Sequence, residues 1–194
     1  MSTPPHTPPT STLQGDTVGE LIASGAQWLQ GAGIAFGHGT TNAADEAAWL
    51  VLWRLGLPLD APLGDDIDSV QNQAVTPAGR ALVATLFEER ISTRKPAAYL
   101  TREAWLQGVS FYVDERAIVP RSLIAELIVD GGFDDFLGEH TQRVLDLCTG
   151  NGSLAVLTAM AWPEVQVTGA DISDDALAVA RINVDQHGLH ERIT

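Results

Sequence analysis

The sequence predicts an α/β protein in which a helical N-terminal domain and a β-hairpin linker precede the start of a doubly wound, Rossmann-like domain. Three observations support this fold class. Residues 16–97 carry apolar side chains at helical spacing, and residues 98–119 contain short aromatic and β-branched runs. From Arg143 onward, predicted strands and helices alternate with short loops, which is typical of a parallel sheet.

The helical spacing of apolar side chains recurs three times in the N-terminal domain. The helices are predicted over residues 16–36, 43–55 and 77–90. Asn42 can cap the second helix at its start, while Gly56 and Pro58 end it. Pro77 suits the first turn of the third helix, where its missing N–H costs no hydrogen bond.

Two segments of the N-terminal half are expected to lie outside these helices. Residues 1–15 are rich in Pro and Thr and cannot bury much surface, so we expect a disordered tail. Residues 57–74 are loop-like and contain the acidic cluster Asp65, Asp66 and Asp68. We interpret the cluster as a solvated loop, with a contact to a basic substrate as the alternative.

Residues 98–119 are expected to form the hairpin linker. The runs Ala104–Leu106 and Val109–Val113 flank Gln107-Gly108, a dipeptide suited to a tight turn between two strands. A second extended run is expected over Arg116–Val119, because this segment is also β-branched and stops at a proline.

Residues 120–194 are expected to begin the Rossmann-like domain, with a short helix after Ser122. Strands are predicted over residues 143–147 and 165–170, and each is followed by a helix. Ser173 can cap the second of these helices, which ends at Gly188. Only two strands can be counted after Arg143.

A glycine-containing turn, within Asp146-Leu-Cys-Thr-Gly-Asn-Gly-Ser153, joins the first strand to its helix. Its glycines allow a tight turn and close approach of a ligand to the backbone, and the helix N-terminus presents unpaired N–H groups. A carboxylate ends the next strand, where it can accept both hydroxyls of a ribose. This combination predicts a nucleoside-cofactor site formed by Asp146, Cys148, Thr149, Gly150, Asn151, Gly152, Asp171 and Ile172.

Two cofactors compete for this site. Gly150 to Ala155 matches the G-x-G-x-x-A pattern of dinucleotide binding, which favours NAD. Asp146 would repel a pyrophosphate, whereas the ammonium and sulfonium groups of S-adenosylmethionine favour a nearby carboxylate. We therefore expect S-adenosylmethionine, with an aspartate that only caps the loop as the alternative interpretation of Asp146.

Composition and charge argue against several classes of function. The chain has 194 residues, and 25 acidic against 11 basic side chains give it a net charge of −14. This charge disfavours binding to nucleic acid or an anionic membrane, and no apolar run approaches the roughly 20 residues of a membrane span. One cysteine and five scattered histidines predict no metal site. Without a signal peptide, a cytoplasmic protein is expected. The acidity fits a basic protein partner, with acidity that only aids solubility as the alternative.

The motifs also carry a family resemblance. DLCTGNG followed by ADIS-x-x-ALAVA is similar to the first two motifs of class I methyltransferases that modify glutamine side chains. Tyr99–Ile128 resembles the hairpin and VPRS segment of the PrmB group, and Phe36–Asp60 resembles that group's helical N-terminal domain. The resemblance runs from about Leu21 to the last residue. Its N-terminal part favours the PrmB group over the release-factor-modifying relatives.

This resemblance implies S-adenosylmethionine-dependent methylation of one glutamine side-chain amide in large-subunit ribosomal protein three. It places Pro120 and Arg121 on the substrate side, and it implies that an Asn-Pro-Pro-Tyr motif holds the amide. No Asn-Pro pair occurs in the chain, so no catalytic residue is assigned within it. Leu106 and Leu123 depart from the group's pattern, in which an aromatic residue and a proline are expected.

The missing motif and the two countable strands lead us to expect a C-terminally truncated chain that is inactive alone. A release-factor glutamine methyltransferase, a non-catalytic module that binds a ribosomal protein, and an NAD-dependent dehydrogenase stay open as alternatives, as does a homodimer. Cys148 is interpreted as a small filler rather than a catalytic thiol, and His38 as a turn residue. For Arg121, a surface salt bridge is the alternative to a substrate contact.

Overall fold

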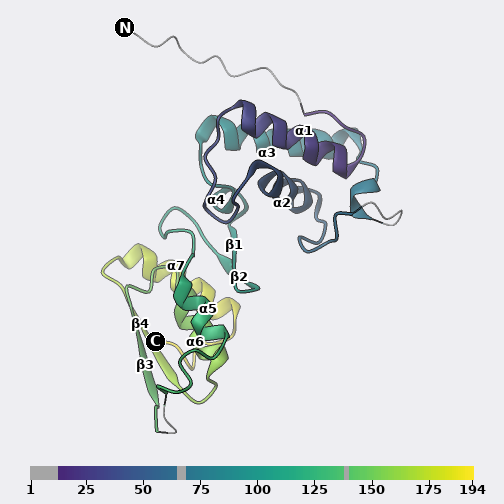
Figure 1. The fold of residues 1–194 in the computed structure, drawn as a ribbon. Helices are drawn as coiled ribbons and strands as arrows, with labels where there is room; N and C mark the ends of the chain where they lie inside the picture. The colour runs from purple at the N-terminus through teal and green to yellow at the C-terminus, as the bar shows by residue number, and fades with distance from the viewer. Residues whose placement is uncertain (1–12, 65–68, 138–139) are drawn as a thin grey trace. The chain divides into compact units, whose positions relative to one another are not determined.

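The computed structural model describes residues 13–64, 69–137 and 140–194 (Figure 1). Most of the predicted tail and the whole acidic cluster of Asp65, Asp66 and Asp68 lie outside these described residues. The chain divides into two compact units, residues 1–101 and 102–194, and each contains a hydrophobic core of its own. Helices and strands are both present, which confirms the α/β class.

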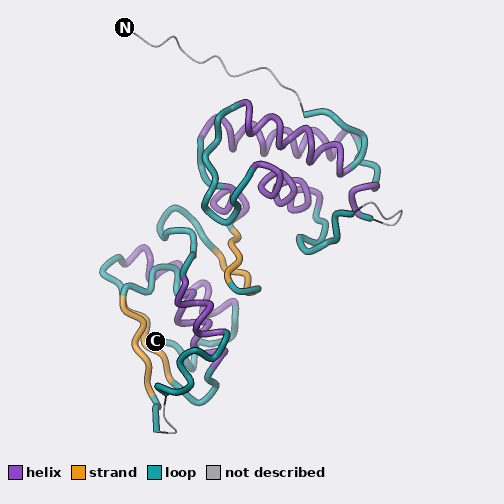
Figure 2. The backbone as a smooth tube through the Cα atoms, in the orientation of Figure 1, coloured by secondary structure: helices purple, strands orange, loops and turns teal. Residues whose placement is uncertain are grey.

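The first unit is helical (Figures 1 and 2). Its elements are α1 (Val18–Gly31), α2 (Ala43–Leu55), the 3₁₀ turn η1 (Val70–Asn72), α3 (Pro77–Thr93) and α4 (Ala97–Thr101). The three predicted helices are confirmed, although α1 ends at Gly31 rather than near Phe36. The sequence does not predict η1 and α4, because so few residues carry no readable periodicity.

Polar side chains cap the first two helices of this unit, at Thr17, which the sequence analysis does not predict, and at Asn42, which it does. In α1, Thr17 and Glu20 form a capping box, in which each side chain accepts a hydrogen bond from the other residue's N–H. In α2, the Asn42 side-chain oxygen accepts from the Asp45 N–H at 2.9 Å. Gly56 ends α2 in the left-handed conformation, with φ of 67°.

An ion pair lies inside this helical unit. Arg90 Nε of α3 donates to Glu46 Oε1 of α2 at 2.7 Å, and both side chains are under 5% exposed. The other carboxylate oxygen of Glu46 accepts from the Thr40 hydroxyl at 2.9 Å, and Arg90 Nη2 donates to the Ala35 carbonyl at 3.1 Å. The pair therefore ties two helices to the segment that connects α1 with α2.

The second unit begins with the predicted hairpin. Strands β1 (Glu103–Leu106) and β2 (Val109–Tyr112) pair antiparallel, with Leu106 opposite Val109. Gln107 and Gly108 have φ of 51° and 74°, the left-handed pair of a type I′ turn, which matches the twist of the strands. The hairpin is confirmed.

The second extended run, predicted over Arg116–Val119, is wrong. Asp114 Oδ1 accepts from the Arg116 N–H at 3.0 Å, and a turn forms at this point with irregular backbone after it. An aspartate that bonds the backbone two residues ahead favours a turn over a strand, and this local bond outweighs the β-branched composition.

The remaining elements of the second unit are a parallel pair of strands and the helices before, between and after them (Figure 2). They are α5 (Leu123–Val129), β3 (Arg143–Leu147), α6 (Ser153–Ala161), β4 (Gln166–Ala170) and α7 (Asp174–Gln186). The two predicted strands and the helices around them are confirmed. In the parallel register, Asp146 lies opposite Gly169 and Leu147 opposite Ala170. No helix in the described part of the chain has the length and apolarity that crossing a membrane requires.

Beyond β4, residues 192–194 run parallel to that strand. Val167 N donates to the Arg192 carbonyl at 2.9 Å, and Thr194 N donates to the Val167 carbonyl at 3.0 Å. The count of two strands after Arg143 is confirmed, and an isolated bridge at Ile193 adds a short third segment beside β4. Three residues are too few to show a strand pattern in the sequence. On β3, the side chains of Leu145 and Leu147 are 61% and 70% exposed.

Candidate functional site

The loop between β3 and α6, residues 148–152, turns through three left-handed residues. Cys148, Gly150 and Gly152 have φ of 63°, 58° and 80°. At Gly152 packing also favours glycine, because a Cβ there would lie 3.0 Å from the Cβ of Ala180 in α7. Nothing lies within 4 Å of a Cβ placed on Gly150, so only the backbone conformation favours glycine there. We call residues 148–152 the glycine loop.

Two carboxylates hold the glycine loop in place. Asp146 Oδ2 accepts from the Thr149 hydroxyl at 2.6 Å, and Asp171 Oδ2 accepts from the Gly150 N–H at 2.9 Å. The Thr149 N–H donates to the Ala170 carbonyl at 2.9 Å, which attaches the loop to the end of β4. The structure therefore brings together the two acidic residues that the sequence assigns to this site.

Asp171 is fixed by bonds on both of its oxygens. Its Oδ1 accepts from the Ser173 N–H at 3.0 Å, in addition to the bond from Gly150. These backbone hydrogen bonds, from Ser173 first and Gly150 second, lower the pKa of Asp171 below its usual value. The carboxylate is thus ionised at neutral pH, and each oxygen keeps a lone pair that can accept from a ligand hydroxyl.

Two exposed side chains and one buried amide lie in or beside the glycine loop. Ile172 is fully exposed, and Cys148 is also exposed. Asn151 is 3% exposed, and its side-chain oxygen accepts from the Ser153 N–H at 3.3 Å. Its Nδ2, although buried, has no hydrogen-bond partner among the described residues. A buried N–H donor without a partner costs free energy, so the Asn151 Nδ2 is available to a polar ligand group at this loop.

The residues assigned to the substrate side lie before α5. Pro120 is buried and Arg121 is exposed, and within the described ranges no hydrogen bond joins Arg121 to the glycine loop. Of the two departures from the family pattern, Leu106 packs against the core of the second unit, whereas Leu123 is 83% exposed. The assignment of Pro120 and Arg121 to the substrate side therefore stays a prediction.

Sequence reasoning misses Asn183, the polar side chain that contacts this site from α7. It is fully buried, and its Nδ2 donates to the Asn151 carbonyl at 2.8 Å and to the Tyr112 carbonyl at 3.0 Å. A signal is present in the sequence: Asn183 falls at helical spacing with the buried Val179 and Ala180, so a polar residue occupies an apolar face.

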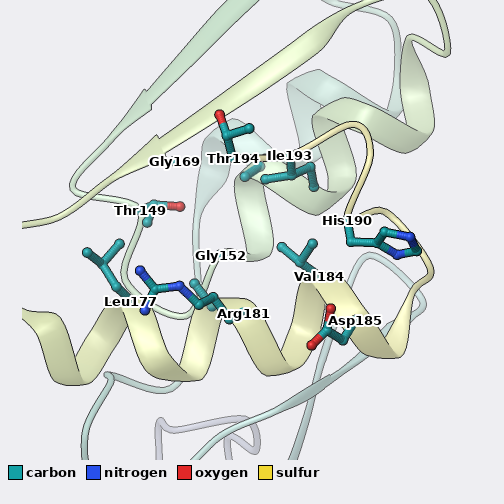
Figure 3. A pocket seen from close by; sticks show the side chains of 12 residues that line it. Thr149, Gly152, Gly169, Leu177, Arg181, Val184, Asp185, His190, Ile193 and Thr194 are labelled. Carbon is teal, nitrogen blue, oxygen red and sulfur yellow. The ribbon is translucent and has the colours of Figure 1, made fainter.

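A cavity of ≈ 280 Å³ lies between α7, the glycine loop and residues 190–194 (Figure 3). Arg181, Asp185 and His190 line it, together with Thr149 and Gly152 of the loop. Neither Asp146 nor Asp171 lines this cavity, which shares Thr149 and Gly152 with the site that the sequence predicts.

Comparisons with known proteins assign a class to the second unit. Residues 132–194 match the family model of the methyltransferase small domain. This range includes the glycine loop and both of the acidic residues that hold it.

The wider comparison covers nearly the whole chain. The chain is 47% identical over 186 residues, 95% of its length, to the ribosomal protein uL3 glutamine methyltransferase of Burkholderia pseudomallei. The proteins of that name from Bordetella pertussis and Neisseria meningitidis serogroup A are 47% and 43% identical, over 92% and 91% of the chain. The chain spans 57–59% of the length of these relatives. The predicted resemblance to the PrmB group is confirmed.

Proposed function

We propose that the full-length protein methylates a glutamine side chain of ribosomal protein uL3, with S-adenosylmethionine as the methyl donor. The observation that carries this proposal is identity of 43–47% to relatives of that name over 91–95% of the chain, through both units. The names of these relatives favour uL3 over a release factor as the substrate.

The contacts of the glycine loop support S-adenosylmethionine rather than a dinucleotide. A pyrophosphate would need free N–H groups at this turn, yet the Gly150 N–H already donates to Asp171. Two carboxylates bond the loop, and they favour a cationic ligand over an anionic one. S-adenosylmethionine carries an ammonium and a sulfonium and has no phosphate, so it fits this donor set.

The roles of the loop residues follow from their chemistry. Asp171 would accept the ribose hydroxyls, since its carboxylate is ionised and held from behind by two backbone N–H groups. The exposed Ile172 would cover an apolar face of the nucleoside, and Asn151 would offer its unpartnered Nδ2 after a small side-chain rotation. Asp146 and Thr149 would stay bonded and hold the loop open for the positive end of the ligand.

The bound cofactor supplies an electrophilic methyl group, and the amide nitrogen of glutamine is a poor nucleophile. The protein must therefore hold that amide in line with the methyl group and exclude water.

We propose that the first unit recognises the substrate. Charge supports a basic partner for the second half, where residues 98–194 contain 15 acidic and 6 basic side chains.

A pair of matched variants tests the cofactor site. In the full-length protein, Asp171→Asn should weaken S-adenosylhomocysteine binding by about 10- to 100-fold in calorimetry, because a ribose acceptor loses its charge. Asp174→Asn, an exposed position in the first turn of α7, should leave the affinity unchanged. Equal affinities in the two variants would contradict the site.

Transfer of a labelled methyl group tests the substrate. Purified uL3 should become labelled on glutamine, and a variant of uL3 without its glutamines should not. A protein that binds uL3 and transfers no methyl group would favour a non-catalytic binding module. A thermal shift with NAD and none with S-adenosylhomocysteine would favour a dehydrogenase.

A further inference from the structure

The side chain of Asn183 uses its oxygen and its nitrogen at the same time. Tyr112 N donates to its Oδ1 at 2.7 Å, and its Nδ2 donates to the carbonyls of Tyr112 and Asn151. Because Tyr112 belongs to β2 and Asn151 to the glycine loop, one fully buried amide joins the hairpin to the loop.

The hairpin contacts α7 through an edge that β1 leaves unpaired. In an antiparallel pair closed by a two-residue turn, Val109 and Phe111 exchange backbone bonds with β1, so the backbone groups of Ser110 and Tyr112 face outward. Asn183 bonds Tyr112, and His187 Nε2 lies 2.9 Å from the Ser110 carbonyl.

The spacing of these two contacts is matched. Four residues of a helix rise about 6 Å, and two residues of a strand rise about 6.8 Å. Asn183 and His187, four apart in α7, can therefore reach backbone groups two apart in β2. The Phe111 ring also packs against the His187 ring, with the centroids 5.4 Å apart. Side chains of α7 thus bond the edge of β2 as a neighbouring strand would.

We propose that Asn183 is a positioning residue through which docking of the β1–β2 hairpin on α7 and cofactor binding at the glycine loop strengthen each other. The inference rests on the proposed function, since it needs a cofactor at that loop. A ligand that orders the loop orders the Asn151 carbonyl, which holds the Asn183 amide in the rotamer that bonds Tyr112. Coupling between two sites is reciprocal, so a loosened hairpin must lower cofactor affinity by the same factor.

Amide hydrogen exchange in the full-length protein measures this coupling. With saturating S-adenosylhomocysteine, exchange of the Tyr112 N–H should slow in the wild type, along with exchange in residues 149–152. In Asn183→Ala, the affinity should fall about tenfold. At saturation in that variant, the loop should still be protected while Tyr112 is not, a pattern that general destabilisation does not produce.

A second variant keeps the inference testable if Asn183→Ala fails to fold. His187 bonds the hairpin at Ser110 and, within the described residues, has no bond to the glycine loop. By linkage alone, His187→Ala should weaken S-adenosylhomocysteine binding about threefold. His140→Ala, an exposed histidine before β3, is the matched control and should not change it.

The two proposals fail in different ways. If the wild type does not bind S-adenosylhomocysteine, the proposed function falls and the inference falls with it. If the wild type binds but Tyr112 exchange is unchanged, or His187→Ala binds as tightly as the wild type, the inference alone is overturned.

Discussion

The ion pair between Glu46 and Arg90 allows a stability prediction with a worked magnitude. Glu46→Ala removes the acceptor of two hydrogen bonds, from Arg90 Nε at 2.7 Å and from the Thr40 hydroxyl at 2.9 Å. At about 1.5–3 kcal/mol for each bond to a charged group, the loss is about 3–6 kcal/mol. Removing one partner of a buried ion pair costs about 3–5 kcal/mol when it leaves the other charge buried, as here for a guanidinium that is only 4% exposed. The two figures agree, and we expect a loss of about 3–5 kcal/mol.

The assay is urea unfolding of the full-length protein, followed by tryptophan fluorescence and by hydrogen exchange in α2 and α3. A domain is stable by about 5–15 kcal/mol in total, so Glu46→Ala should move the midpoint strongly and raise exchange in both helices. The double variant Glu46→Leu with Arg90→Met should recover most of the loss, since no charge is left buried without a partner.

The matched control is Glu88→Ala, an exposed glutamate of α3, which should change stability by less than about 0.5 kcal/mol. The reasoning is refuted if Glu46→Ala costs less than about 1 kcal/mol. It is also refuted if the double variant is less stable than Glu46→Ala, because the charge left behind would then not be the source of the loss.

Three further predictions concern single positions. Hydrogen bonds from Arg116 hold the pKa of Asp114 at about 2, below the usual 3.8. Arg116→Ala should raise the pKa of Asp114 toward 3.8, as measured by NMR titration of the carboxyl group. Because folding lowers this pKa, the pair stabilises the wild type above about pH 4, and this stabilisation is lost as the pH falls toward 2. Gly25→Ala in α1 should lower stability by about 1–3 kcal/mol, although alanine has the better helix propensity, because the new Cβ would lie 2.5 Å from the buried Phe87 ring. An unchanged midpoint of urea unfolding would contradict this prediction. Cys148→Gly should be at least as stable as the wild type in thermal unfolding, because φ of 63° is unfavourable for residues with a Cβ. Cys148→Val should lose about 1–2 kcal/mol, because a β-branched side chain tolerates this φ less well than cysteine does.

Local signals in the sequence predict the elements of this fold. Asn42 and Ser173 cap the helices that they are expected to cap, and Gln107-Gly108 forms the hairpin turn. These signals are readable because each depends on backbone conformation within a few residues. The glycine loop and Asp171 are placed for the same reason, since their spacing follows from the strand–turn–helix order.

Contacts between distant residues are not predictable in this way. The pairing of Thr194 with Val167 depends on how α7 returns the chain to the sheet, and the pairing of Arg90 with Glu46 depends on helix packing. Asn183 bonds Tyr112 across 71 positions, and no pattern within α7 names that partner. At Arg116–Val119, composition favours a strand, but one side-chain bond from Asp114 decides the backbone conformation.

The uncovered leucines of β3 have a consequence for the behaviour of the chain at high concentration. Within the described residues, β3 pairs with β4 alone, and Leu145 and Leu147 stand exposed on one face. An open strand edge beside apolar side chains can recruit a strand from another molecule. Net negative charge keeps molecules apart at long range, but salt screens it beyond about 10 Å. In the 194-residue chain by itself, aggregation should therefore begin at Leu145 and Leu147 and accelerate with ionic strength.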